Sequence, residues 1–157
     1  MTAPPRIDYP AFTKLAPDAY AALVALGRQP DSPGLDKALI ELVKIRASQI
    51  NGCAFCLHIH LGVARRIGVA AIKLDLLAAW HDATVFSARE QAALAWAECL
   101  TSLPDAGAPD DRYAALRAHF TEAEIARLSV AIATINAWNR LGAGLRFAPQ
   151  LPSEPPA

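Results

Sequence analysis

Residues 41–60, ELVKIRASQINGCAFCLHIH, hold most of the reactive side chains of this chain. Two cysteines form a C-x-x-C pair, Cys53 and Cys56, while His60 follows one helical turn later and Glu41 opens the stretch. Because residues three or four apart share one face of a helix, the two thiols are expected side by side, with the imidazole on the face of Cys56. The stretch therefore combines the groups that proton-coupled thiol chemistry needs.

The Asn51-Gly52 pair divides this stretch into two helices, because both residues tolerate the left-handed backbone that ends a helix. One helix is predicted from about residue 35 to 50. The next begins at or just before Cys53 and ends near residue 67. A turn at the Asn-Gly pair can fold Glu41 back over the cysteines. Other helices are predicted by periodicity and by two capping boxes, S87-A-R-E90 and T121-E-A-E124, at about 17–26, 70–80, 87–99, 110–119 and 121–145.

No segment alternates as a strand does, and no repeat of solenoid period is present. The expected fold class is therefore all-α, a single compact domain of about six or seven helices. Residues 1–16, which are rich in proline, are predicted to be an extended N-terminal arm. Residues 17–147 form the predicted helical domain, and the proline-rich residues 148–157 a flexible C-terminal tail.

Composition narrows the possible functions. Of the 157 residues, 54% are hydrophobic and 19% are charged, which predicts a homo-oligomer that buries apolar surface between subunits. The formal net charge is zero, and the absence of a basic run argues against nucleic-acid binding. Neither a signal-peptide pattern nor an apolar run long enough for a bilayer is present, so a soluble cytoplasmic protein without a membrane partner is expected. In a reducing compartment, a C-x-x-C pair indicates redox chemistry or metal binding.

Each reactive residue also has a simpler interpretation. The two cysteines can be buried side chains without a role, and Glu41 can pair with Lys37 or Lys44 on its own helix. A lone histidine such as His60 is more often structural. We expect His58 to point away from the pair, and Cys99 to be a structural residue of an apolar helix.

A zinc site is the main alternative for the cluster, because two thiolates, an imidazole and a carboxylate can hold zinc tetrahedrally. The chain has no second C-x-x-C and no H-x-x-x-H, however, so the spacing is a poor match to a zinc finger. Leu57 stands where a c-type haem signature requires histidine. No cofactor is predicted.

The spacing Glu41, eleven residues, Cys53, two residues, Cys56, three residues, His60 resembles the signature of the AhpD-like alkylhydroperoxidases within the carboxymuconolactone decarboxylase superfamily. The resemblance is closest over residues 35–68. A looser one continues through SAREQAALAWAE and IATINAWNRLG, and so covers most of the chain. It implies an all-helical fold and assembly as a trimer or hexamer.

The resemblance also implies a mechanism. Cys56 would be the peroxidatic cysteine that attacks an organic hydroperoxide, and Cys53 the resolving cysteine that closes a disulfide. Glu41 and His60 would form the proton relay, and a lipoyl- or thioredoxin-type dithiol would restore the pair. The residues themselves support a different order of attack, because the positive end of the helix dipole favours the thiolate of Cys53, the thiol nearest the helix start.

The chain departs from the pattern of the best-known members at one position. Those members carry a histidine directly before the second cysteine, where this chain has Phe55. Two alternatives to a peroxidase therefore stay open. One is a carboxymuconolactone-decarboxylase-like enzyme, a branch that does not depend on a C-x-x-C pair. The other is a redox-sensing or structural oligomer whose disulfide reports oxidant.

Overall fold

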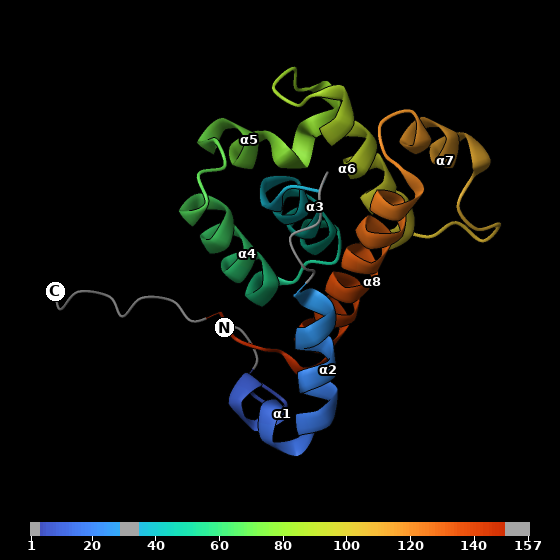
Figure 1. Cartoon of the computed structure of the whole chain (residues 1–157). Helices are drawn as coiled ribbons and strands as arrows, with labels where there is room; N and C mark the ends of the chain where they lie inside the picture. The colour runs from blue at the N-terminus through green and yellow to red at the C-terminus, as the bar shows by residue number, and fades with distance from the viewer. Residues whose placement is uncertain (1–3, 29–34, 150–157) are drawn as a thin grey trace, which may run out of the picture.

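Helix α3 (Lys37–Ile50) lies in the middle of the protein (Figure 1), in a computed structural model that describes residues 4–28 and 35–149. Half of this helix is buried, including Leu42, Val43 and Ile45, which have no exposed surface. It packs against three neighbours: α4 (Ala54–Arg66), α6 (Ala88–Thr101) and α8 (Glu122–Leu145). Because α3 carries Glu41 and α4 begins beside the cysteines, this packing sets the geometry of the reactive stretch.

The remaining helices cover the outside of this bundle. Figure 1 shows two of them at one end, where α2 lies beside α8, and the others above α3 and beside α6. They are α1 (Tyr9–Leu15), α2 (Pro17–Gly27), α5 (Ala71–Leu76), the 3₁₀ helix η1 (Leu77–Asp82) and α7 (Asp110–Arg117). The described ranges contain eight α-helices and no strand, which confirms the all-α prediction, although the predicted number of six or seven helices was too low.

Local signals in the sequence account for where the helices begin. Both predicted capping boxes are present. The side chains of Ser87 and Thr121 accept hydrogen bonds from the backbone N–H groups of Glu90 and Glu124. The glutamate side chains in turn accept hydrogen bonds from the backbone N–H groups of Ser87 and Thr121. Helix α3 begins after Asp36, whose side chain accepts a hydrogen bond from the backbone N–H of Leu39 at 2.6 Å. Gly52, with φ of +63°, supplies the left-handed turn that ends α3.

Two predictions of local structure were wrong. The arm expected to be extended over residues 1–16 contains α1, because Asp8 caps it and Pro10 stands in its first turn, where proline is tolerated. The helix expected over residues 70–80 changes to the 3₁₀ form at Leu77 and has a non-helical residue, Ala79. The part of the predicted tail from residue 150 onward lies outside the described residues.

The buried side chains form three groups around α3. One joins it to α6, α7 and α8, and a second joins it to α4, α5, η1 and α6. The third contains both cysteines of the C-x-x-C pair and the aromatic rings of Phe12, Phe55 and Phe147. Among the residues that the structure describes, no helix has both the length and the apolar content needed to cross a lipid bilayer.

Candidate active site

Cys53 and Cys56 are joined by a disulfide at the start of α4, with their Cα atoms 5.4 Å apart. Cys53 is the N-cap residue of this helix, and its sulfur accepts a hydrogen bond from the backbone N–H of Cys56 at 3.3 Å. Only 2% of Cys53 and 3% of Cys56 is exposed, so a reagent reaches these sulfurs only through a cavity or after local movement. The expectation that the spacing places the two sulfurs side by side is confirmed.

Glu41 reaches from α3 to His60 on α4, where its Oε2 lies 2.7 Å from Nδ1 of the imidazole. Its other oxygen, Oε1, accepts a hydrogen bond from Nζ of Lys44 at 3.0 Å. Glu41 therefore contacts His60 and Lys44 at the same time, because the carboxylate has two oxygens and uses one for each partner. The turn at residues 51–52 brings the two helices close enough for this contact.

The surroundings of Glu41 keep this side chain ionised. Its burial raises the pKa, but hydrogen bonds and charge interactions with His60 and Lys44 more than offset this effect. The net result is a pKa below the ordinary value of a glutamate. An ionised Glu41 can hold the imidazole in one orientation and stabilise it when it takes up a proton.

A cavity of about 180 Å³ brings Cys56 and His60 together. The two residues belong to its lining, and most of the other side chains around it are apolar or aromatic. These come from α1, α2, α4 and α8: Tyr9, Val24, Phe55, Ile59, Ile135 and Trp138. Burial, with the hydrogen bond and charge of Tyr20, raises the pKa of Tyr9 to about 12, so its hydroxyl stays protonated. The cavity therefore suits a small apolar molecule whose reactive group points to the sulfur.

Phe55, the residue between the cysteines, is packed into an aromatic cluster. Its ring centroid lies 5.0 Å from that of Tyr9 and 5.3 Å from that of Phe147, and 7% of the residue is exposed. Aromatic pairs at such separations stabilise a fold beyond the burial of their surface. The position where the best-known AhpD-like proteins carry a histidine is thus occupied here by a packing side chain.

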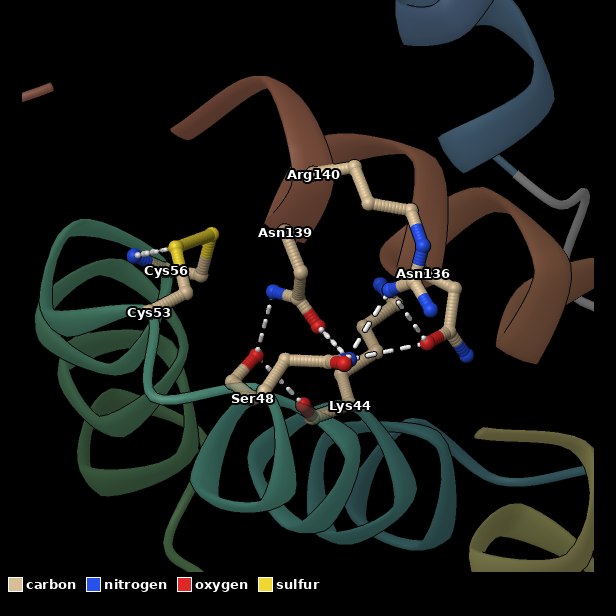
Figure 2. Close-up of a disulfide and its surroundings, with 8 residues drawn as sticks. Lys44, Ser48, Cys53, Cys56, Asn136, Asn139 and Arg140 are labelled. Carbon is tan, nitrogen blue, oxygen red and sulfur yellow. Dashed lines mark hydrogen bonds between the residues drawn. A yellow bond between two sulfur atoms is a disulfide. The ribbon is translucent and has the colours of Figure 1, made fainter. Parts of the chain in front are cut away.

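A network of polar side chains, of which Ser48 and Asn139 are buried, holds the turn between α3 and α4 against α8, next to the disulfide (Figure 2). Asn139 donates a hydrogen bond to Ser48 Oγ at 3.0 Å and accepts one from Asn51 Nδ2 at 2.9 Å. Asn51 also donates to Asn136 and accepts from Arg140, at 2.8 and 3.0 Å. This network was not predicted from the sequence. The sequence feature that indicates it is the set of polar residues at positions 136, 139 and 140, which interrupt an otherwise apolar segment.

Gly142 is a second residue that the sequence analysis missed. A Cβ atom added at this position would lie 2.9 Å from the sulfur of Cys53 and 3.5 Å from that of Cys56. The first distance is shorter than van der Waals contact allows, so glycine is what lets α8 pass over the disulfide. The contact joins residues far apart in the chain, and only the packing of α8 reveals it.

The other cysteine and histidine considered in the sequence lie outside this site, and the described residues form no metal-binding cluster. Cys99 is a partly buried free cysteine on α6. His58 is exposed and does not line the cavity that contains Cys56. Within residues 4–28 and 35–149, no three His, Cys, Asp or Glu side chains form a group that could hold a metal ion.

Known proteins with similar sequences and structures identify the family of this chain. Residues 17–98 match the model of the carboxymuconolactone decarboxylase family. The uncharacterised protein YdfG of Bacillus subtilis (strain 168) is 33% identical over 131 residues, which are 83% of this chain and 89% of that protein. An Agrobacterium tumefaciens protein of unknown function, proposed to be an antioxidant defence protein AhpD, is 38% identical. Its structure superimposes with a TM-score of 0.87 over 95% of this chain and all of that one.

A more distant structure shares the fold. It is an uncharacterised peroxidase-related protein from Ralstonia eutropha JMP134, described as an alkylhydroperoxidase AhpD core. The two chains are 22% identical, with a TM-score of 0.78 over 89% of this chain and 75% of the other. From the family match, the similarity to YdfG and the fold, this chain belongs to the carboxymuconolactone decarboxylase family and has an AhpD-like structure.

Proposed function

We propose that this protein is a thiol-dependent peroxidase that reduces organic hydroperoxides through the Cys53–Cys56 pair. The supporting observation is the 2.7 Å contact between Glu41 and His60, on a histidine that lines the same cavity as Cys56. A buried thiol pair alone is compatible with a structural role. An ionised carboxylate that orients an imidazole beside one of the thiols is what activation of that thiol requires.

The first step oxidises Cys56. With the pair reduced, His60 accepts the thiol proton at Nε2, because Nδ1 is engaged with Glu41. The Cys56 thiolate attacks the terminal oxygen of the hydroperoxide, so that an S–O bond forms and the O–O bond breaks. The leaving alkoxide takes the proton back from His60 and departs as the alcohol, and Cys56 is left as a sulfenic acid.

The second step closes the disulfide. Cys53 attacks the sulfur of Cys56, an S–S bond forms, and the hydroxyl of the sulfenic acid leaves as water with the proton of the Cys53 thiol. A dithiol reductant of the lipoyl or thioredoxin type then returns two electrons and two protons by thiol–disulfide exchange. Such a cycle belongs in a reducing compartment, so we propose a cytoplasmic location. In the proposed cycle, the disulfide between Cys53 and Cys56 is the oxidised state.

The decisive measurement is hydroperoxide consumption with a dithiol reductant. We expect turnover by the native protein and its loss in both Cys56→Ser and Cys53→Ser, whereas Cys99→Ser, which changes a free cysteine on α6, stays active. A sulfenic acid trapped on Cys56 in the Cys53→Ser variant would identify the attacking thiol. Trapping on Cys53 in the reverse experiment would instead support the helix-terminus argument.

The relay is tested by Glu41→Gln, which keeps the shape of the side chain and removes its charge. We expect the rate of hydroperoxide reduction to fall by about a hundredfold, the lower range of what general acid–base catalysis contributes. Glu98→Gln is the matched control: Glu98 also binds a histidine, with 2.9 Å between its Oε2 and Nε2 of His81, and also has a lowered pKa. Equal losses in the two variants would contradict the relay.

A redox sensor is the second candidate function, and the packing of Phe55 in place of a relay histidine favours it. A disulfide that forms and is reduced without catalytic turnover would support the sensor. Carboxymuconolactone-decarboxylase-like chemistry, the third possibility within this family, would persist when both cysteines are replaced by serine.

A further inference from the structure

A second cavity, of about 440 Å³, lies along α4 beside the cavity that contains Cys56. Three residues, Tyr9, Phe55 and Ile59, line both cavities, so the two adjoin. The other residues around the larger cavity are His58, Gly62 and Arg66. A volume of several hundred Å³ is typical of sites for small organic ligands.

Helix geometry sets the arrangement of the residues that line the larger cavity. Phe55, Ile59, Gly62 and Arg66 are spaced by four, three and four residues, so they form one stripe along α4. Cys56 lies on the neighbouring stripe, ten residues before Arg66. With a rise of 1.5 Å per residue, the thiol and the guanidinium-bearing residue are about 15 Å apart along the helix axis.

The two ends of this surface differ in chemistry. The end near Cys56 is aromatic, whereas the far end has the guanidinium of Arg66 and the imidazole of His58. No aspartate or glutamate lines either cavity in the described part of the chain, and no carboxylate there pairs with Arg66. A guanidinium next to an apolar wall is suited to binding a carboxylate by two parallel hydrogen bonds.

Gly62 connects the cationic end to the apolar surface. Nη1 of Arg66 lies 3.6 Å from where a Cβ atom on Gly62 would be, so the guanidinium folds back along α4 over this residue. Glycine is less favourable than alanine in the interior of a helix. Here the missing side chain leaves the floor of the cavity open between Ile59 and Arg66.

We propose that the 440 Å³ cavity binds the apolar chain and the carboxylate of a hydroperoxy acid, with Arg66 as the carboxylate anchor. This inference rests on the proposed peroxidase function and specifies its substrate class. Hydroperoxides of long-chain fatty acids have the required parts: an anionic end, an apolar chain, and a hydroperoxide group separated from the carboxylate. Bound along α4, such a molecule presents the hydroperoxide to Cys56 while Arg66 holds its other end.

The test compares linoleic acid hydroperoxide with its methyl ester, which has the same chain and hydroperoxide group but a neutral methyl ester in place of the carboxylate. We expect the native protein to have a higher kcat/KM for the acid, and Arg66→Gln to reduce the acid-to-ester ratio about fivefold, the upper range for a solvent-exposed ion pair. Arg65→Gln removes the same charge from the adjacent exposed residue, which does not line the cavity, and should keep the native ratio. Equal ratios in all three proteins, or equal reductions in both variants, would overturn the proposal.

A binding measurement separates this inference from the proposed function. Decanoate is an unreactive probe with the same charge and an apolar chain. In calorimetry, we expect decanoate to bind the native protein and Arg65→Gln with similar affinity, and to bind Arg66→Gln more weakly. Gly62→Leu, which places a side chain in the cavity, should abolish this binding. If no hydroperoxide is consumed but decanoate binds in this order, the peroxidase is wrong and the anion site stands. If hydroperoxides are consumed and decanoate does not bind, the anion site is wrong.

Discussion

Gly142 faces the disulfide from α8, and its missing side chain makes room for the sulfur of Cys53. The site thus depends on a residue with no reactive group. Glu41 and His60 are different, because their roles follow from what their side chains can donate and accept. Since the Cβ position is 2.9 Å from the sulfur of Cys53, a methyl group there would clash with this atom, whereas the 3.5 Å to the sulfur of Cys56 is ordinary contact.

Replacing Gly142 by alanine should therefore destabilise the oxidised protein. We expect the free energy of unfolding to fall by about 1–3 kcal/mol, the usual effect of extra atoms in a well-packed core. Gly144→Ala is the matched control, because Gly144 lies on the same helix with nothing within 4 Å of its Cβ position. Alanine there should stabilise the protein by about 0.5–1 kcal/mol. Urea unfolding without reductant measures both, and a stabilising Gly142→Ala would refute the contact.

At the scale of elements, the packing of α3 and α4 against α8 positions the cysteines. The turn that carries Cys53 is tied to α8 by the hydrogen bonds of Asn51, Ser48 and Asn139. Ser48 is fully buried and Asn139 is 1% exposed. Buried polar groups that are fully hydrogen-bonded specify one arrangement of the elements they join, because any slip leaves them unsatisfied.

We expect Asn139→Ala to lower the free energy of unfolding by about 1–3 kcal/mol, because it removes the hydrogen bonds that Asn139 makes with the buried Ser48 and the half-buried Asn51. A double-mutant cycle with Ser48→Ala should give a coupling energy of about 1 kcal/mol. Thr134→Ala serves as the control, since Thr134 is buried on the same helix but donates only to Val130 of its own helix among the described contacts. Its cycle with Ser48→Ala should be additive. A Ser48–Asn139 cycle that is also additive would mean that the network does not couple α3 to α8.

At the scale of the whole molecule, apolar surface is left exposed at one end. Helix α2 has no buried residue although most of its side chains are apolar. Leu26 is 50% exposed on this helix, and Leu15 is 73% exposed at the end of α1. Both helices lie at the end of the bundle away from α5 (Figure 1). A surface of this kind is typical of a contact between subunits.

We therefore predict a homo-oligomer that buries α2 between subunits; the resemblance to AhpD-like proteins implies that it is a trimer or hexamer. Leu26→Glu should reduce the molar mass measured by light scattering, because burial of an unpaired carboxylate in an apolar contact is costly. Leu103→Glu changes a side chain that is 57% exposed between α6 and α7, and it should leave the native mass unchanged. A native protein with the mass of one chain, or equal effects of the two variants, would contradict the prediction.

Features that depend on neighbours in the chain could be predicted from the sequence. The spacing of Cys53 and Cys56, the capping boxes and the helical periodicity all depend on residues three or four positions apart, so the sequence indicates them without any tertiary contact. The short helix α1 was missed because three prolines dominated the N-terminal pattern, whereas Asp8 and Pro10 are favourable at a helix start. The Glu41–His60 contact could also be predicted from the sequence, because only one turn separates the two helices.

The tertiary structure alone decided which distant residues complete the site. Gly142 and Asn139 meet the cysteine turn across about ninety residues; the separation is 88 between Asn51 and Asn139 and 91 between Ser48 and Asn139. Both cavities require α1 to lie beside α4, and the cavity that contains Cys56 also requires α2 and α8. An all-α protein with a thiol pair, an imidazole and a carboxylate within one helical hairpin could be predicted from local sequence patterns. The cavities next to the thiol pair form only when the helices pack, because packing brings together side chains that are far apart in the sequence.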